Sequence, residues 1–212
     1  MAGAAIERVK ATYTAPIREL ASRSVRSLAR TRVSPNALTA AGVSLCLAGA
    51  VLVYFEDRND LVFYYVGGAT FVIGSLLDIL DGALARAGGK QTPFGAFIDS
   101  TTDRVGEAAM LAAIALVFAR HGHEVALGFT FAAVAGSFLV SYTRARAEAL
   151  GLRGDVGIGS RAERVTVIGV GLAVAAWGLL PYAIYLLTAT AWVTVMQRAL
   201  HVRRQLRERD SH

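Results

Sequence analysis

Six apolar runs, each close to the length of a bilayer-spanning helix, constrain the fold of this chain more than any other feature. A spanning helix needs about 20 mostly apolar residues. Of the 212 residues, 54% are hydrophobic and the mean hydropathy is +0.46, which excludes an ordinary soluble domain. No run alternates like a barrel strand, so we predict an all-α integral membrane protein with six transmembrane helices. The runs cover residues 36–56, 61–82, 95–119, 123–143, 163–180 and 182–200.

The residues before the first run have a different character. Residues 1–33 mix cationic and apolar side chains and lack the apolar core of a cleavable signal peptide. This pattern predicts an amphipathic juxtamembrane helix that lies on anionic lipid headgroups. The runs show no internal repeat, so we expect one transmembrane domain over 34–205 and a short cytoplasmic tail over 206–212.

Lysine and arginine residues gather on one side of the predicted membrane protein. The amino-terminal segment carries seven of them, whereas the opposite side has only Arg58 and Arg120. The positive-inside rule therefore predicts a multi-pass protein of the plasma membrane with both termini in the cytoplasm. The net charge of +6 is then explained by binding to the membrane surface and to phosphate-bearing substrates. No nucleic-acid-binding motif appears, so we do not expect nucleic acid as a partner.

Four aspartates interrupt the apolar sequence around the second and third runs: Asp78, Asp81, Asp99 and Asp103. An aspartate at the centre of a transmembrane helix costs about 2.5–3.5 kcal/mol on insertion. Spacings of three and four residues place each pair on one helix face, so two helix ends could bring all four carboxylates together. Oxygen ligands without histidine or cysteine favour Mg²⁺, with Mn²⁺ as the alternative, and four carboxylates suit two ions. Two-ion sites are a recurring device of phosphoryl chemistry, and this predicted site would be cytoplasmic.

The residues between the aspartates fit a phosphate-bearing ligand. Gly82, Ala85 and Gly95 are small enough to let a phosphate or a ribose approach the backbone. Arg86 is suited to a phosphate oxygen or to a metal-bound carboxylate. The alternative, in which the acids are ordinary surface residues at helix ends, does not account for four of them on two matching faces.

This stretch resembles the CDP-alcohol phosphotransferases, and it matches the signature of that family without a gap or substitution. The matching residues are Asp78-x2-Asp81-Gly82-x2-Ala85-Arg86-x8-Gly95-x3-Asp99-x3-Asp103. Members of that family are integral membrane enzymes with six transmembrane helices. They move a phosphoalcohol from a CDP-linked donor to an acceptor hydroxyl and release CMP. The resemblance implies that the four aspartates surround a two-metal site and that Asp103 is also the general base.

The resemblance extends to the donor site. The segment Ser34-Pro35 has ordinary helix-start chemistry, and in the family the segment that follows also contacts the nucleotide. The resemblance implies that CDP-diacylglycerol is bound by Asn36, Ala37, Leu38, Thr39, Gly82, Ala85, Arg86, Thr92 and Gly95.

Arginines cluster between the fourth and fifth runs, in a region that is similar to the bacterial phosphatidylinositol-phosphate synthases. Those enzymes join inositol phosphate to the phosphatidyl group of CDP-diacylglycerol. The resemblance implies that Arg144, Arg164 and Arg198 bind the acceptor phosphate, with Arg144 standing where relatives often have lysine. A basic cytoplasmic loop can also act only in setting topology, and the alternative stays open for Arg146, Arg153 and Arg161.

The resemblance thus implies a phospholipid-biosynthesis transferase that acts as a homodimer. Glycerol 3-phosphate as the acceptor, giving phosphatidylglycerophosphate, and an archaeal-type lipid donor both stay open. An ion transporter is the alternative from another class, and it is disfavoured because the acids lie near one face of the membrane. Small residues permit close helix contacts, within one subunit or between two: Gly67, Gly68, Gly74, Gly169, Gly171 and Ala175.

Overall fold

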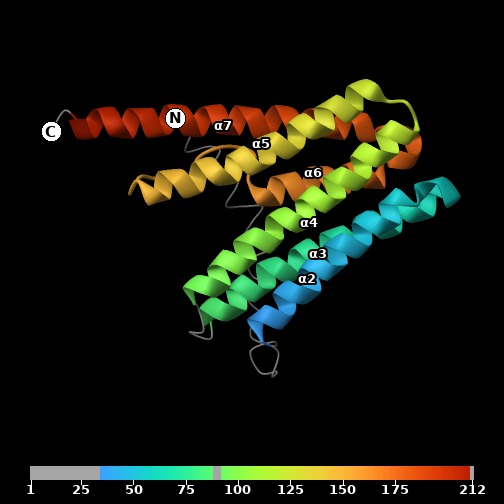
Figure 1. The fold of residues 1–212 in the computed structure, drawn as a ribbon, viewed down its shortest axis with the longest axis horizontal. Helices are drawn as coiled ribbons and strands as arrows, with labels where there is room; N and C mark the ends of the chain where they lie inside the picture. Colours follow the sequence, from blue (N-terminus) through green and yellow to red (C-terminus); the bar gives the residue numbers. More distant parts are fainter. Residues whose placement is uncertain (1–33, 88–91, 211–212) are drawn as a thin grey trace, which may run out of the picture.

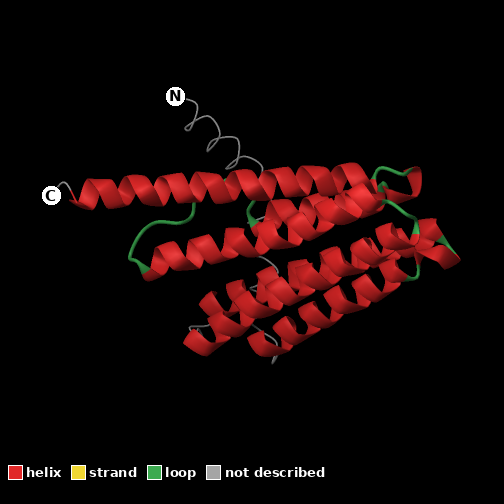
Figure 2. Ribbon diagram, turned by 45° about the horizontal axis from the view of Figure 1, so that its top comes forward, coloured by secondary structure: helices red, strands yellow, loops and turns green. Residues whose placement is uncertain are grey.

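The computed structural model describes residues 34–87 and 92–210, which form a bundle of long helices (Figures 1 and 2). The described residues contain no strand, so the all-α prediction is confirmed. Two short 3₁₀ turns, η1 and η2, join neighbouring helices. In chain order the elements are α2 (Pro35–Tyr54), η1 (Glu56–Arg58), α3 (Asp60–Ala87), α4 (Pro93–Arg120), α5 (Glu124–Ala149), α6 (Arg161–Ala173), η2 (Ala175–Trp177) and α7 (Leu180–Asp210).

Three helices of the described part are long and apolar enough to cross a membrane, by length and composition: Asn36–Tyr54, Asp60–Leu80 and Glu124–Ala149. Helices α4 and α7 have 28 and 31 residues but carry more charged side chains. The run expected at 163–180 divides into η2 and the 13-residue α6, which is shorter than the ~20 residues that span a bilayer. The chain is therefore a helical membrane protein, whereas six transmembrane helices stay a prediction.

Only some of the predicted domain limits fall within the described residues. The amphipathic helix expected over 1–33 lies outside them. At the other end, α7 continues without a break to Asp210, past residue 206 where the tail was expected to begin. The limits therefore remain predictions.

Glycines hold α2 and α3 close together along their length. A Cβ added at Gly74 would lie 2.6 Å from the carbonyl oxygen of Gly42, and one at Gly49 would lie 2.7 Å from that of Gly67. Neither distance leaves room for a side chain, so the two backbones are in direct contact. All five glycines singled out for close helix contact thus pack inside this chain, including Gly169 against Val72.

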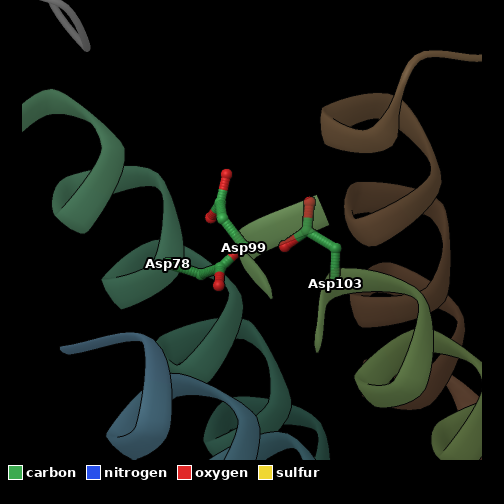
Figure 3. Close-up of side chains that lie close together, drawn as sticks. All are labelled: Asp78, Asp99 and Asp103. Atoms are coloured by element: carbon green, nitrogen blue, oxygen red, sulfur yellow. The ribbon is translucent and has the colours of Figure 1, made fainter. Parts of the chain in front are cut away.

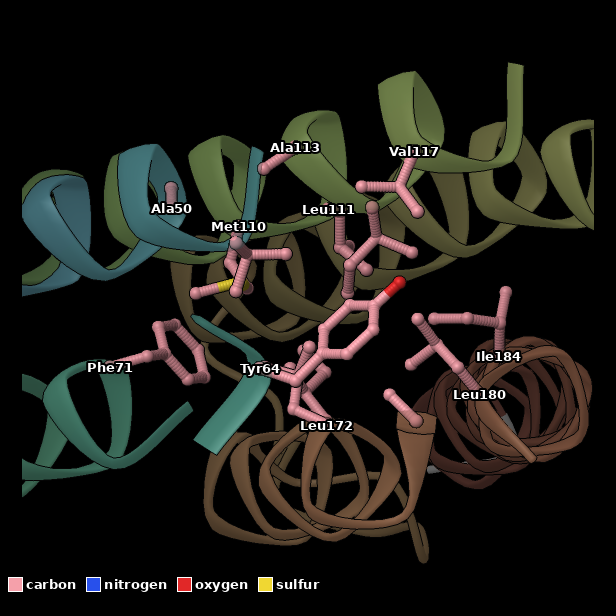
Figure 4. Packing of buried hydrophobic residues seen from close by; sticks show 14 of the residues in the cluster. Ala50, Tyr64, Phe71, Met110, Leu111, Ala113, Val117, Leu172, Leu180 and Ile184 are labelled. Carbon is pink, nitrogen blue, oxygen red and sulfur yellow. The ribbon is translucent and has the colours of Figure 1, made fainter. Parts of the chain in front are cut away.

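The buried core draws side chains from all six helices, α2 to α7. Figure 4 shows part of this core, in which Met110 and Leu111 of α4 belong to the same cluster as Phe71 of α3 and Leu172 of α6. Many large apolar side chains on the outside are exposed, for example Val51, Ile73 and Phe131. An apolar exterior around a packed core is what a lipid environment favours.

Candidate active site

Three of the four predicted acids meet between α3 and α4. Asp78 lies near the end of α3, and Asp99 and Asp103 lie one turn apart on α4. One carboxylate oxygen of each lies within 4.8 Å of the others, and Figure 3 shows the three side chains around one space. Asp81 falls among residues 81–91, outside the described side chains.

The start of α4 explains how its acids come to share one face. Thr92 caps the helix by accepting a hydrogen bond from the Gly95 N–H at 2.9 Å, and Pro93 occupies the first turn. From this start, Asp99, Asp103 and Glu107 follow at intervals of four residues and lie on one side of the helix. Thr92 and Gly95 thus have structural roles at this helix end, and their part in donor binding stays a prediction.

The acid cluster fits a hard divalent cation. The Oδ2 atom of Asp78 and the Oδ1 atom of Asp103 are buried and accept no hydrogen bond. A buried carboxylate oxygen without a hydrogen bond is costly unless a cation compensates it, and in this structure the Arg161 guanidinium lies against both atoms. Oxygen-only ligands of this kind suit Mg²⁺ or Mn²⁺.

Arg161, the first residue of α6, reaches these same two oxygens. Its Nη1 lies 2.5 Å from Asp78 Oδ2 and its Nη2 lies 2.6 Å from Asp103 Oδ1. The guanidinium therefore supplies charge to two of the three acids from a third helix. A capping interaction orients this end of α6, where the Glu163 carboxylate accepts a hydrogen bond from the Ser160 N–H at 2.6 Å.

A cavity of about 630 Å³ opens beside the acids. Its lining includes Asp99 and Asp103 and all three predicted acceptor arginines, Arg144, Arg164 and Arg198. The structure thus brings together residues from α4, α5, α6 and α7 that lie far apart in the sequence. Such a cavity, with cations next to a carboxylate cluster, can accommodate a small phosphorylated molecule.

The three arginines differ in how firmly they are held. Arg164 makes a buried two-point ion pair with Glu107, at 2.7 Å from Nε to Oε1 and 2.8 Å from Nη2 to Oε2. Arg198 donates to the carbonyl oxygens of Val156, at 2.8 Å, and Val140. Arg144 pairs with Glu148 at 2.9 Å, and both side chains are more than half exposed. Two of the arginines are therefore preorganised, and the third is exposed.

The predicted donor residues lie at the start of α2. Asn36 and Ala37 are exposed, whereas Leu38 and Thr39 are buried. This helix end is close to the acids, because a Cβ on Gly42 would lie 3.5 Å from the Cβ of Asp78. Three further predicted donor residues, Gly82, Ala85 and Arg86, lie outside the described side chains.

Sequence reasoning missed Glu107 and left the role of Arg161 open. Glu107 continues the four-residue spacing of Asp99 and Asp103, so its position on the same helix face could have been read from the sequence. Arg161 carried no comparable signal, because its proximity to Asp78 and Asp103 depends on how α6 packs against α3 and α4.

The family model described as CDP-alcohol phosphatidyltransferase matches residues 32–200. An archaetidylinositol phosphate synthase of Pyrococcus horikoshii is 34% identical over 191 residues, which is 90% of this chain and 94% of that protein. A phosphatidylinositol phosphate synthase of Streptomyces avermitilis is 34% identical over 195 residues, covering 87% of this chain and 78% of the relative.

Solved structures are also similar. The phosphatidylinositol phosphate synthase of Mycobacterium tuberculosis with CDP-DAG bound superposes with a TM-score of 0.75 at 30% identity, covering 87% of this chain and 94% of that one. The same enzyme in complex with manganese and citrate has a TM-score of 0.75 at 30% identity, covering 86% and 88% of the two chains. The likeness therefore extends over nearly the whole described bundle.

Proposed function

Because this chain belongs to the CDP-alcohol phosphatidyltransferase family, we propose that it transfers the phosphatidyl group of CDP-diacylglycerol to inositol phosphate. The products are phosphatidylinositol phosphate and CMP. Relatives named for inositol phosphate products and a similar structure with CDP-DAG bound support this choice.

The position of Asp103 is the main support for this proposal. Asp103 belongs to the acid cluster and also lines the cavity that contains Arg144, Arg164 and Arg198. A phosphorylated acceptor held by the arginines would therefore have its hydroxyl groups within reach of a carboxylate base.

The residues of the chain take the following parts. Arg164, Arg198 and the exposed Arg144 hold the acceptor phosphate. Asp103 accepts the proton of the acceptor hydroxyl, whose oxygen attacks the lipid-side phosphorus. The bond from that phosphorus to CMP then breaks, and the nucleotide leaves with the electron pair. Asn36, Ala37, Leu38 and Thr39 contact the donor nucleotide, together with Gly82, Ala85, Arg86, Thr92 and Gly95.

Divalent cations belong to the same proposal. Asp78, Asp81, Asp99 and Asp103 would hold two Mg²⁺ ions, which neutralise charge on the diphosphate when bound. The cluster of carboxylate oxygens and the manganese in a similar structure support a divalent ion. Mn²⁺ is the alternative.

The topology completes the proposal. The chain would cross the plasma membrane six times, with the amphipathic helix of residues 1–33 on the cytoplasmic surface ahead of the domain 34–205. The active site and both termini would face the cytoplasm, where a water-soluble phosphorylated acceptor is available. A homodimer is proposed on the family resemblance.

Release of CMP by purified protein tests the reaction. The assay supplies CDP-diacylglycerol and Mg²⁺ and compares inositol 1-phosphate with glycerol 3-phosphate. We expect release with inositol 1-phosphate and not with glycerol 3-phosphate. The opposite preference would keep the chemistry but refute the acceptor, and no release with either would refute the enzyme class.

The identity of the lipid donor is tested separately, because one similar relative is named archaetidylinositol phosphate synthase. The same assay with a CDP-linked archaeal ether lipid would show whether the tails matter. We expect the diacylglycerol donor to be preferred. A clear preference for the ether lipid would assign the other donor.

A further inference from the structure

Arg161 forms a bridge between two aspartates that belong to different helices. Its guanidinium contacts Asp78 of α3 at 2.5 Å and Asp103 of α4 at 2.6 Å, while Arg161 itself begins α6. The Asp78 side chain is 5% exposed and that of Asp103 is 20% exposed. This is a largely buried ion pair, and its position links three helices.

The two contacted oxygens belong to carboxylates of the cluster that could hold a metal ion. Asp78 Oδ2 and Asp103 Oδ1 are buried and accept no hydrogen bond, so the guanidinium balances their charge without satisfying their lone pairs. A divalent ion would bind such oxygens directly, at about 2.0–2.1 Å for Mg²⁺. A metal ion and a guanidinium on the same oxygens would repel each other strongly at low dielectric.

Arg161 is also placed to serve a second site. It lines the small cavity next to Asp78 and Gly42 and also the large cavity that contains Arg164 and Arg198. Arg161 and Arg164 are three residues apart on α6 and therefore lie on the same side of this helix. A guanidinium that leaves the aspartates is thus already at the wall of the arginine-lined cavity.

We propose that Arg161 is an internal counter-ion of the acid cluster, which divalent metal displaces, and that the displaced side chain then binds the acceptor phosphate. The second half of this inference rests on the proposed function. Metal binding and acceptor binding would be coupled through one residue, and the coupling would act in both directions.

The other cavity arginines do not have this property. Arg164 is paired with Glu107 and with the Gly159 carbonyl oxygen, and Arg198 is held by two backbone carbonyl groups. These partners are not members of the acid cluster, so a metal ion has no direct reason to release either arginine. Arg161 is therefore distinguished by its contacts rather than by its charge.

Binding of Mn²⁺, followed by electron paramagnetic resonance without lipid or acceptor, tests the exchange. We expect Arg161→Gln to bind Mn²⁺ at least about fivefold more tightly than the unaltered protein, the low end of typical coupling energies. Arg104→Gln is the matched control, because Arg104 lines the same cavity and donates to the Ser100 carbonyl oxygen. Equal effects of the two substitutions, or weaker binding by Arg161→Gln, would overturn the proposal.

A second measurement needs no variant and covers the case in which Arg161→Gln does not fold. Phenylglyoxal modifies free guanidinium groups, and mass spectrometry reports each arginine separately. We expect Mg²⁺ to increase the modification of Arg161 and to leave that of Arg164 unchanged. Unchanged or reduced modification of Arg161 on metal addition would refute the exchange.

Acceptor binding tests the second half. Inositol 1-phosphate and glycerol 3-phosphate are each titrated with and without Mn²⁺. We expect Mn²⁺ to strengthen acceptor binding in the unaltered protein and to do so much less in Arg161→Gln. Full retention of the Mn²⁺ effect in the variant would refute the phosphate role. If neither acceptor bound the unaltered protein, the proposed function would fail, and the metal measurements would still decide the exchange.

Discussion

Asp103 takes part in two groups of side chains at once. Its carboxylate lies in the acid cluster with Asp78 and Asp99, contacts Arg161, and lines the arginine cavity. A residue at the boundary between a cation site and an acceptor cavity is well placed to transfer a proton there.

We expect Asp103→Asn to lower kcat for CMP release by at least about 10²-fold, the low end for loss of a general base. The amide keeps the size of the side chain but cannot accept the proton. The control is Asp57→Asn at the opposite end of the bundle, where Asp57 is exposed and pairs with Arg120. Activity in Asp103→Asn within tenfold of the unaltered protein would contradict its role as the base.

A second prediction at this scale compares two arginine–glutamate pairs. The Arg164–Glu107 side chains are 4% and 6% exposed, whereas those of Arg144–Glu148 are 56% and 55% exposed. Removing one partner of a buried pair leaves an uncompensated charge and costs about 3–5 kcal/mol. Exposed pairs contribute about 0–1 kcal/mol.

Glu107→Gln should therefore lower the unfolding temperature in detergent far more than Glu148→Gln. Thermal unfolding followed by circular dichroism measures both variants. Similar unfolding temperatures for the two variants would mean that Arg164 keeps its position without Glu107.

At the scale of the elements, the contact of α2 with α3 positions the acids. Gly74 lies one helical turn before Asp78 and contacts the backbone of α2 at Gly42. A shift of α3 away from α2 would move Asp78 relative to Asp99 and Asp103, because these two residues lie on a different helix.

We expect Gly74→Ala to destabilise the protein by about 1–3 kcal/mol, the usual cost of overpacking. Its new Cβ would lie 2.6 Å from the Gly42 carbonyl oxygen. Gly128→Ala on α5 is the matched control, because a Cβ there meets nothing within 4 Å, and alanine favours the helix by about 0.5–1 kcal/mol. Thermal unfolding of both variants checks the prediction, and an unchanged midpoint for Gly74→Ala would show that the helices can separate at little cost.

At the scale of the whole molecule, the bundle has two polar ends. One holds the acids and the arginine cavity. The other joins η1 to the end of α4, where the buried Glu56 carboxylate lies 3.1 Å from Arg120 and 3.0 Å from His121. Exposed apolar side chains lie on the helices between these ends, as expected for a protein that crosses a bilayer.

The proposed orientation predicts which end is accessible from outside the cell. We expect a membrane-impermeant maleimide to label His123→Cys in intact cells and to label Arg153→Cys only after lysis. Both residues are exposed, and the native Cys46 is buried, so the unaltered protein gives the background. Labelling of Arg153→Cys in intact cells would reverse the orientation.

Much of the site could be predicted from the sequence because its spacing is local. Aspartates three or four residues apart on a helix share a face, so the pairing of Asp99 with Asp103 needs no knowledge of the fold. The same reasoning could have included Glu107. The role of Arg161 could not be predicted this way, because its partners lie 58 and more residues away in the chain.

The amino-acid sequence was enough to predict a helical membrane protein whose aspartates match the signature of one enzyme family. Apolar runs, charge asymmetry and residue spacing along a helix are properties of the chain alone. The folded structure was needed to see that Arg161 contacts the acids and that Arg144, Arg164 and Arg198 line one cavity. These outcomes depend on the packing of helices that are distant in sequence. That packing follows from the fit of glycines and core side chains, such as Gly74 against Gly42, across the whole bundle.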